Sequence, residues 1–171
     1  MSDEAMRRPI IFLDIDGVLV IKSYPARPRM LAYAGARRRA GLPALPMILR
    51  AANMFVPAAV GHLNDLCAQT VALLVLSSSW RLRDDVHEQL AAAGITAPFH
   101  PDWRTDSAGP LRSDEIQRWV DAHGRPPFVV LDDWPHELEA LASVTVRTNY
   151  RTGLTSADCD AARVILSATA Q

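Results

Sequence analysis

The sequence predicts an α/β fold, in which a doubly wound, Rossmann-like parallel sheet carries helices on both faces. Three short runs are continuously apolar rather than alternating, which is typical of strands covered by helices on both sides. These runs are residues 10–13, 71–76 and 128–131. Helical patterns separate them, so right-handed crossovers should join consecutive strands. A weaker run, 144–148, alternates and is expected near an edge of the sheet.

Helices are expected where apolar residues recur at helical spacing between residues typical of helix ends. They cover residues 57–69, 81–93 and 114–123 and a C-terminal segment that starts at residue 155. Gly94 and Gly124 stand just after two of them, where a glycine often ends a helix. Ser113 is expected to cap the third, and Thr155 with Asp158 resembles a capping box.

Length and composition predict one soluble domain that spans residues 1–171. The chain is 49% apolar and 22% charged, with a net charge of −1, which is ordinary for a globular protein. No segment approaches the ~20 apolar residues of a membrane span, and the N-terminal residues lack the apolar stretch of a signal peptide. We therefore expect a cytoplasmic protein without membrane contact.

The positive charge is concentrated in one segment. Seven of the 18 basic residues lie between Asp16 and Asp65, whereas no acidic residue does. We interpret residues 20–56 as a basic flap or small cap inserted into an acidic body. Within it, a short helix ended by Gly41 is expected, and four prolines interrupt the rest.

Two carboxylates close the first strand. Asp14 and Asp16 follow residues 10–13, and the alternation of side chains along a strand places both on one side. Gly17 then lets the chain turn away without a Cβ penalty. Carboxylates this close repel unless a cation or a shared proton lies between them, and a hard divalent ion such as Mg²⁺ suits oxygen ligands. The simpler interpretation is a solvated acidic turn.

Polar residues also follow the other two strong strands. Ser77, Ser78 and Ser79 come after the second, and Asp132 and Asp133 after the third. Ligands of open α/β sheets bind beyond the carboxyl ends of the strands, so these clusters should lie along one edge. Each cluster alone is typical of a solvated loop or a helix cap, but three together predict a binding site.

The polar clusters belong to motifs that resemble the haloacid dehalogenase superfamily of phosphohydrolases. IFLDIDGV resembles its first motif, LLVLS its second and VVLDD its fourth. More narrowly, LSSSWR, RSDEIQRWV, VVLDDW and GLT resemble the small domain of Swiss Army Knife RNA repair proteins. The resemblance covers nearly the whole chain apart from residues 24–55, and it implies that fold with only a small cap.

The resemblance implies a phosphatase that acts through an aspartyl phosphate. Asp14 would be the nucleophile, and Asp16 the general acid and then the base for water. Ser77 would donate a hydrogen bond to the phosphoryl group. Mg²⁺ is the implied cofactor, held by Asp14, Asp16 (through its backbone carbonyl), Asp132 and Asp133. Such a carboxylate nucleophile splits one difficult displacement into two easier ones.

The third motif departs from the superfamily, which usually has a lysine that pairs with the nucleophile. The best candidate here is Arg112, just before the helix that leads into the last strong strand. Arginine keeps the charge and offers a fork suited to phosphate, but it is larger and never deprotonates. Arg81 is a rival cation, and a surface arginine near a helix start is the simpler interpretation of Arg112.

Substrate contacts are expected from Ser78 and from basic side chains, namely Arg81, Lys22, Arg37, Arg38 and Arg39. The basic insert and the resemblance favour nucleic-acid ends or nucleotides as the phosphorylated substrate, in keeping with nucleic-acid repair. Trp80 and Trp134 follow two of the site loops, where they either stack a base or, as we favour, pack against the sheet edge.

Other functions remain open at this point. A phosphatase for small metabolites is nearly as well supported, because a fold does not fix a substrate. From a different class, a non-catalytic module that binds phosphate or nucleic acid is the alternative. A dehalogenase is disfavoured because halide displacement needs no metal, and a receiver domain because its phosphoacceptor lies on a later strand. The sequence indicates no particular protein partner.

Overall fold

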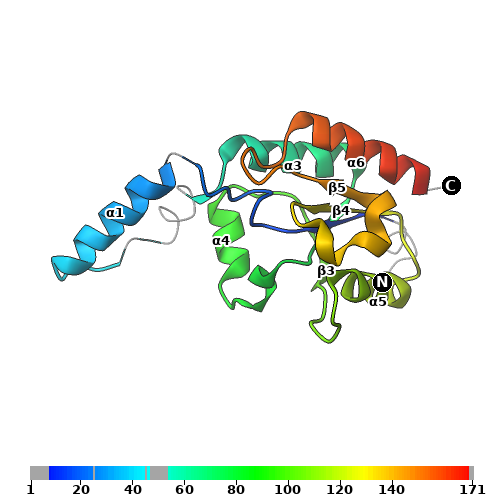
Figure 1. The fold of residues 1–171 in the computed structure, drawn as a ribbon, viewed down its shortest axis with the longest axis horizontal. Coiled ribbons are helices and arrows are strands. Elements are labelled where there is room, and N and C mark those ends of the chain that lie inside the picture. Colours follow the sequence, from blue (N-terminus) through cyan, green and yellow to red (C-terminus); the bar gives the residue numbers. More distant parts are fainter. Residues whose placement is uncertain (1–7, 25, 45, 47–53, 170–171) are drawn as a thin grey trace.

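One parallel sheet organises the molecule (Figure 1). The computed structural model describes residues 8–24, 26–44, 46 and 54–169. Five strands run in the order β3-β2-β1-β4-β5. They are β1 (Ile10–Leu13), β2 (Leu73–Leu76), β3 (Phe99–Arg104), β4 (Phe128–Asp132) and β5 (Thr145–Arg147). The predicted parallel α/β fold is thereby confirmed, with β1 at the centre between β2 and β4.

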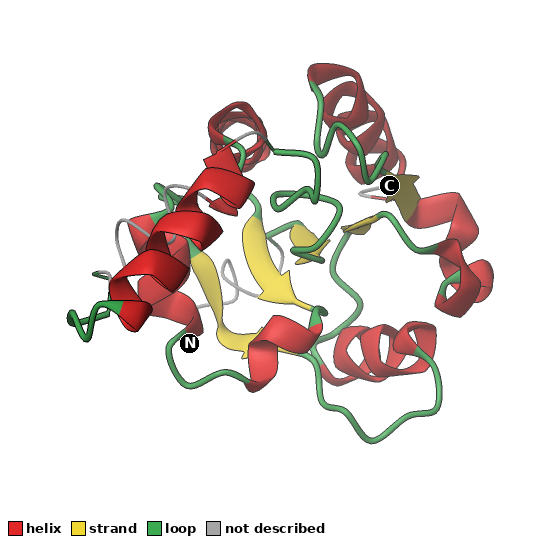
Figure 2. Ribbon diagram, turned by 60° about the vertical axis from the view of Figure 1, so that its left-hand side comes forward, coloured by secondary structure: helices red, strands yellow, loops and turns green. Residues whose placement is uncertain are grey.

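Helices cover both faces of this sheet (Figures 1 and 2). The α-helices are α1 (Ala26–Arg39), α3 (Pro57–Thr70), α4 (Val86–Ala92), α5 (Arg112–Ala122) and α6 (Ser156–Thr169). Short 3-10 helices are η2 (Ser79–Leu82), η3 (Pro135–Glu137) and η4 (Glu139–Val144). In the described part of the chain, no helix is long and apolar enough to cross a membrane.

The two faces of β1 belong to two separate hydrophobic clusters. Ile11 and Leu13 point to the face covered by α3, α4 and α6. Ile10 and Phe12 point to the other face, where α5 and η4 pack, and the Phe12 ring meets Trp119 edge to face at 5.4 Å. Both faces of β1 are buried, so each of its side chains packs in an apolar environment. This explains why the apolar run in the sequence is continuous and does not alternate.

One strand was not predicted. Strand β3 has the sequence FHPDWR, in which most side chains are at least partly exposed and Pro101 lacks a backbone donor. An edge strand tolerates both features, because one of its sides has no ladder partner. The absence of an apolar run therefore concealed β3.

Two details of the predicted helices are also wrong. The expected helix 81–93 is divided into η2 and the shorter α4, which begins only at Val86. Ser113 lies buried inside α5, whose N-cap position is Leu111. The predicted capping box is confirmed, since the Thr155 amide donates to Asp158 Oδ2 at 2.8 Å and the Asp158 amide donates to Thr155 Oγ1 at 3.3 Å.

The basic insert contains the expected helix, α1, which Figure 1 shows extending away from the sheet. After it, Gly41 takes a φ of +67° and the Leu42 amide bonds the carbonyl of Arg37. The ends of the insert meet where Val20 and Phe55 form an antiparallel bridge. Residues 47–53 of the predicted insert lie outside the described residues.

Candidate active site

The ends of three neighbouring strands bring Asp14, Ser77 and Asp132 together. The backbone amide of Asp14 donates to Leu131 in β4 at 3.0 Å, and that of Ser77 donates to Leu13 in β1 at 3.2 Å. Asp14 and Asp132 are only 6% and 1% exposed. The strand order thus places a serine hydroxyl and a carboxylate on either side of Asp14, at the edge that the sequence predicted.

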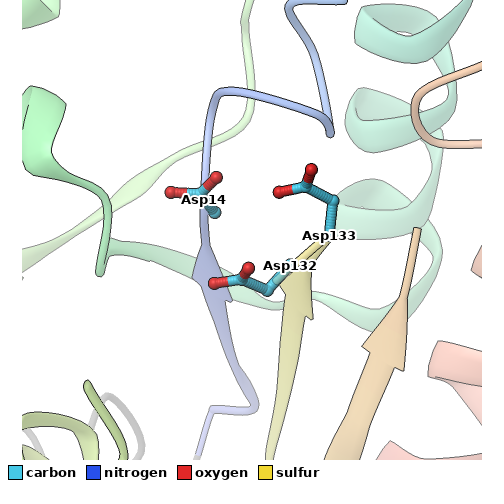
Figure 3. A group of neighbouring side chains, drawn as sticks. All are labelled: Asp14, Asp132 and Asp133. Atoms are coloured by element: carbon cyan, nitrogen blue, oxygen red, sulfur yellow. The ribbon is translucent and has the colours of Figure 1, made fainter. Parts of the chain in front are cut away.

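Asp14, Asp132 and Asp133 form a carboxylate cluster (Figure 3). One oxygen from each lies within 4.8 Å of the others. Burial, and next the charge of Asp132, raise the pKa of Asp14 to about 7, and burial also raises the pKa of Asp132 and of Asp133. Three carboxylate oxygens this close together fit a hard divalent cation such as Mg²⁺, which one or two carboxylates and several waters usually hold.

Gly17 leaves room for this cluster. It has a φ of +80°, and a Cβ at this position would lie 2.2 Å from Cγ of Asp133. The hydroxyl of Thr148 donates to the Gly17 carbonyl at 3.0 Å and fixes the turn. Any larger residue at Gly17 would therefore strain the backbone and displace Asp133.

The late GLT motif supports the same turn from the other side. Gly153 also has a positive φ, +72°, and a Cβ there would lie 2.6 Å from the carbonyl oxygen of Val18. The amide of Leu154 donates to that oxygen at 2.8 Å. The sequence showed the motif, but its contact with the loop after Asp16 appears only in three dimensions.

Arg112 connects two members of the carboxylate cluster. Its Nη1 donates to Asp14 Oδ1 at 3.1 Å and to Asp132 Oδ2 at 2.5 Å, while Nε lies 3.9 Å from Glu137. Burial alone would lower the pKa of Arg112, but the charges of Asp132 and Asp14 outweigh it and raise that pKa. The structure therefore brings the candidate third-motif cation to the candidate nucleophile.

Arg81, the rival cation, has other partners. It is buried, and its guanidinium donates to Glu115 at 2.8 Å and to the carbonyl of Ser77 at 2.7 Å. Burial lowers the pKa of Arg81 and raises that of Glu115. The ion pair therefore stabilises the loop after β2 only after the desolvation of both charges has been offset. Through these bonds Arg81 stabilises the backbone at Ser77. Its position does not support the expected contact with substrate.

Ser77 and Ser78, the first two of the three serines after β2, are both buried. Among the described residues, Ser77 Oγ has no hydrogen-bond partner. The hydroxyl of Ser78 bonds Asp14, which moderates the rise in the pKa of that carboxyl. A buried hydroxyl without a partner is costly, so Ser77 is suited to donate to a bound anion.

Asp16 stands apart from the carboxylate cluster. Its side chain is exposed, and its Oδ2 accepts a hydrogen bond from Trp80 Nε1 at 2.8 Å. The cluster within 4.8 Å consists of the other three aspartates. This separation leaves the Asp16 carboxylate free for proton transfer, whereas only its backbone remains a candidate ligand.

The basic side chains of the insert are not brought to the carboxylates. Lys22 is exposed in the turn before α1. Arg37, Arg38 and Arg39 occupy the last turn of α1, the end of that helix farthest from the sheet in Figure 1. Arg37 donates from Nε and Nη2 to the carbonyl of Pro43, both at 3.1 Å, and so supports the helix end.

The two tryptophans near the site differ. Trp80 is 7% exposed and meets Phe55 edge to face at 5.6 Å, so its expected packing is confirmed. Trp134 is 57% exposed, and packing is the wrong interpretation of its ring. Its backbone amide donates to Asp132 Oδ1 at 2.7 Å, which places the residue beside the site.

The doubly wound sheet, with its carboxylates at the ends of β1 and β4, defines a haloacid dehalogenase (HAD)-type domain. Residues 10–159 match the family described as "HAD domain in Swiss Army Knife RNA repair proteins". Because the match covers most of the chain, the protein belongs to this family. No curated protein and no solved structure gave a significant match.

Proposed function

We propose that the protein is a Mg²⁺-dependent phosphatase that acts through a phosphorylated Asp14. The observation that carries the proposal is the cluster of three carboxylates within 4.8 Å, with Arg112 bonded to Asp14 and Asp132. Phosphoryl transfer depends chiefly on positioning and on neutralising the charge of the phosphoryl oxygens. The guanidinium of Arg112, the hydroxyl of Ser77 and a divalent cation held by the carboxylates would meet both needs at one edge of the sheet.

Each side chain has a defined part in this reaction. A carboxylate oxygen of Asp14 attacks phosphorus, and the leaving oxygen departs with a proton from Asp16. Asp16 then accepts a proton from the water that hydrolyses the aspartyl phosphate. Arg112 and Ser77 donate to the phosphoryl oxygens in both steps. Mg²⁺ held by Asp14, Asp132 and Asp133 would supply further charge neutralisation.

We further propose that the substrate is a nucleotide or the phosphorylated end of a nucleic acid. The family's occurrence in RNA repair proteins supports this substrate class. Trp134 supports it too, because its backbone is bonded to Asp132 and its exposed indole can stack on a base. The exposed arginines of α1 would act at a distance from the phosphoryl group, on the rest of a polyanion.

Phosphate release from p-nitrophenyl phosphate, with Mg²⁺ and with EDTA, tests the reaction. We expect turnover with Mg²⁺ and loss of nearly all turnover with EDTA. Asp14→Asn should reduce the rate by roughly 10³-fold or more, because no other group can form the acyl phosphate. If Asp14→Asn keeps more than about a tenth of the rate, the covalent mechanism is wrong.

Calorimetric titration tests the cation site separately from turnover. Asp132→Ala should lose most of its Mg²⁺ affinity, whereas a change at Asp65, an exposed aspartate on α3, should not alter it. A screen of nucleotides, oligonucleotides with 3′ or 5′ phosphates, and sugar phosphates then tests the substrate class. A preference for sugar phosphates would contradict it.

A further inference from the structure

We infer that Trp80 is a positioning residue for Asp16, an inference that rests on the proposed function. The indole Nε1 donates to Asp16 Oδ2 at 2.8 Å, although 64 positions separate the two residues. Asp16 is exposed, and an exposed aspartate otherwise moves among several rotamers. The hydrogen bond selects one orientation of the carboxylate that is proposed to transfer the proton.

The indole is itself held firmly in place. Its ring is buried against Phe55, and the guanidinium of Arg83 lies 4.9 Å from the ring centre. The Trp80 amide approaches Ser78 Oγ at 3.4 Å. Because packing already fixes the indole N–H, no conformational entropy has to be lost to order this donor during the reaction. This is the advantage of preorganisation.

The chemistry of the indole suits this task. Indole N–H is a donor only, so it bonds an unprotonated carboxyl oxygen in every protonation state of Asp16. With Oδ2 occupied in this way, Oδ1 remains to carry the proton to the leaving group and to take one from water. Trp80 therefore determines which oxygen of Asp16 does the chemistry.

The same residues hold the backbone of Asp16. Asp16 forms a bridge with Val20, Val20 forms one with Phe55, and the Phe55 ring packs on Trp80. Backbone and side chain of Asp16 are thus both connected to the base of the insert. Removing the N–H alone breaks the side-chain connection and leaves the other contacts in place.

Trp80→Phe removes the N–H together with part of the ring, and the leaving group provides the readout that separates proton transfer from packing. A well-placed general acid matters most for a poor leaving group and little for p-nitrophenolate. For an alkyl phosphate such as glycerol phosphate, kcat/KM should therefore fall about 10-fold more than for p-nitrophenyl phosphate. Trp103→Phe, which changes a partly buried tryptophan on β3, should leave the ratio of the two substrates unchanged.

A double-mutant cycle separates action through Asp16 from general damage. Asp16→Asn should show a stronger leaving-group effect, and adding Trp80→Phe to it should change kcat/KM little further. If Trp80→Phe slows both substrates equally, or acts fully in the Asp16→Asn background, the inference is overturned while the phosphatase proposal stands. Absence of turnover by the wild type with any phosphate ester would instead overturn the phosphatase proposal.

If the Trp80→Phe variant fails to fold, NMR of the indole N–H groups tests the inference without measuring turnover. The indole N–H resonances of Trp103, Trp119 and Trp134 are assigned from variants of these three residues, and the fourth resonance then belongs to Trp80. Asp16→Asn should shift the Trp80 resonance and speed its exchange with water, because the acceptor becomes neutral and weaker. An unchanged Trp80 resonance in Asp16→Asn would overturn the inference.

Discussion

Arg112 donates a hydrogen bond to Asp14 at 3.1 Å from a position 98 residues away in the sequence. The same nitrogen donates to Asp132 at 2.5 Å, so one guanidinium bridges two buried carboxylates. The pKa of Asp14 nevertheless stays raised, at about 7. Burial is the largest cause of this rise and the charge of Asp132 is the next, and a divalent cation beside the three carboxylates would offset both.

Arg112→Ala should lower kcat by about 10²–10³-fold, because it removes a donor aimed at the charge that develops in phosphoryl transfer. Arg112→Lys should recover part of this loss, since the ammonium keeps the charge but not the fork. Steady-state kinetics with p-nitrophenyl phosphate measure both. Equal rates for the alanine and lysine variants would show that the charge of Arg112 does not act in the reaction.

The raised pKa of Asp14 predicts how stability depends on pH without metal. Between its ordinary value of 3.8 and about 7, the folded protein binds a proton that the unfolded chain has lost. Stability contributed by the neutral carboxyl is therefore full below the ordinary value and is lost as the pH rises toward 7. Above that range, ionised Asp14 destabilises the fold.

Asp14→Asn should consequently stabilise the metal-free protein by about 1–3 kcal/mol at about pH 8 and change it little at about pH 3.5, below the ordinary pKa of the carboxyl. Urea denaturation in EDTA at both pH values measures this difference. Mg²⁺ should cancel it by stabilising the wild type alone at the higher pH. Asp65→Asn, at an exposed carboxylate, is the matched control. A stabilisation equal at both pH values would contradict the assignment.

Most of the fold and the centre of the site were predictable, because they depend on local pattern. Continuous apolar runs marked β1, β2 and β4, and the residue after each strand must lie at one edge. Strand β3 could not be found in this way, since its edge position permits a polar sequence with a proline. The bond from Trp80 to Asp16 depends on how η2 orients a side chain, which no pattern records.

Gly17→Ala should destabilise the protein and weaken Mg²⁺ binding together. The new methyl group would occupy the space of the Asp133 carboxylate at a backbone φ of +80°, and we expect a cost of about 1–3 kcal/mol. Gly61→Ala in α3 is the control, because no heavy atom of the described residues lies within 4 Å of a Cβ there. Unchanged Mg²⁺ affinity in a folded Gly17→Ala variant would exclude Asp133 from the cation site.

The exposed arginines at the end of α1 give the last prediction. Arg37 bonds the carbonyl of Pro43, so replacing it would disturb the helix end as well as the charge. Arg38→Ser/Arg39→Ser removes only exposed charges. If both contact phosphates of a single-stranded oligonucleotide, the slope of log affinity against log salt should become shallower by about 1.4.

Fluorescence anisotropy across a salt series measures this slope, and p-nitrophenyl phosphate turnover serves as the internal control. Turnover should remain at the wild-type rate, because Figure 1 shows the end of α1 far from the sheet. Binding that keeps the wild-type salt slope would mean that the two arginines form only a solvated surface. A nucleic-acid substrate would then be supported by Trp134 and the family alone, since the charge of α1 would play no part in recognition.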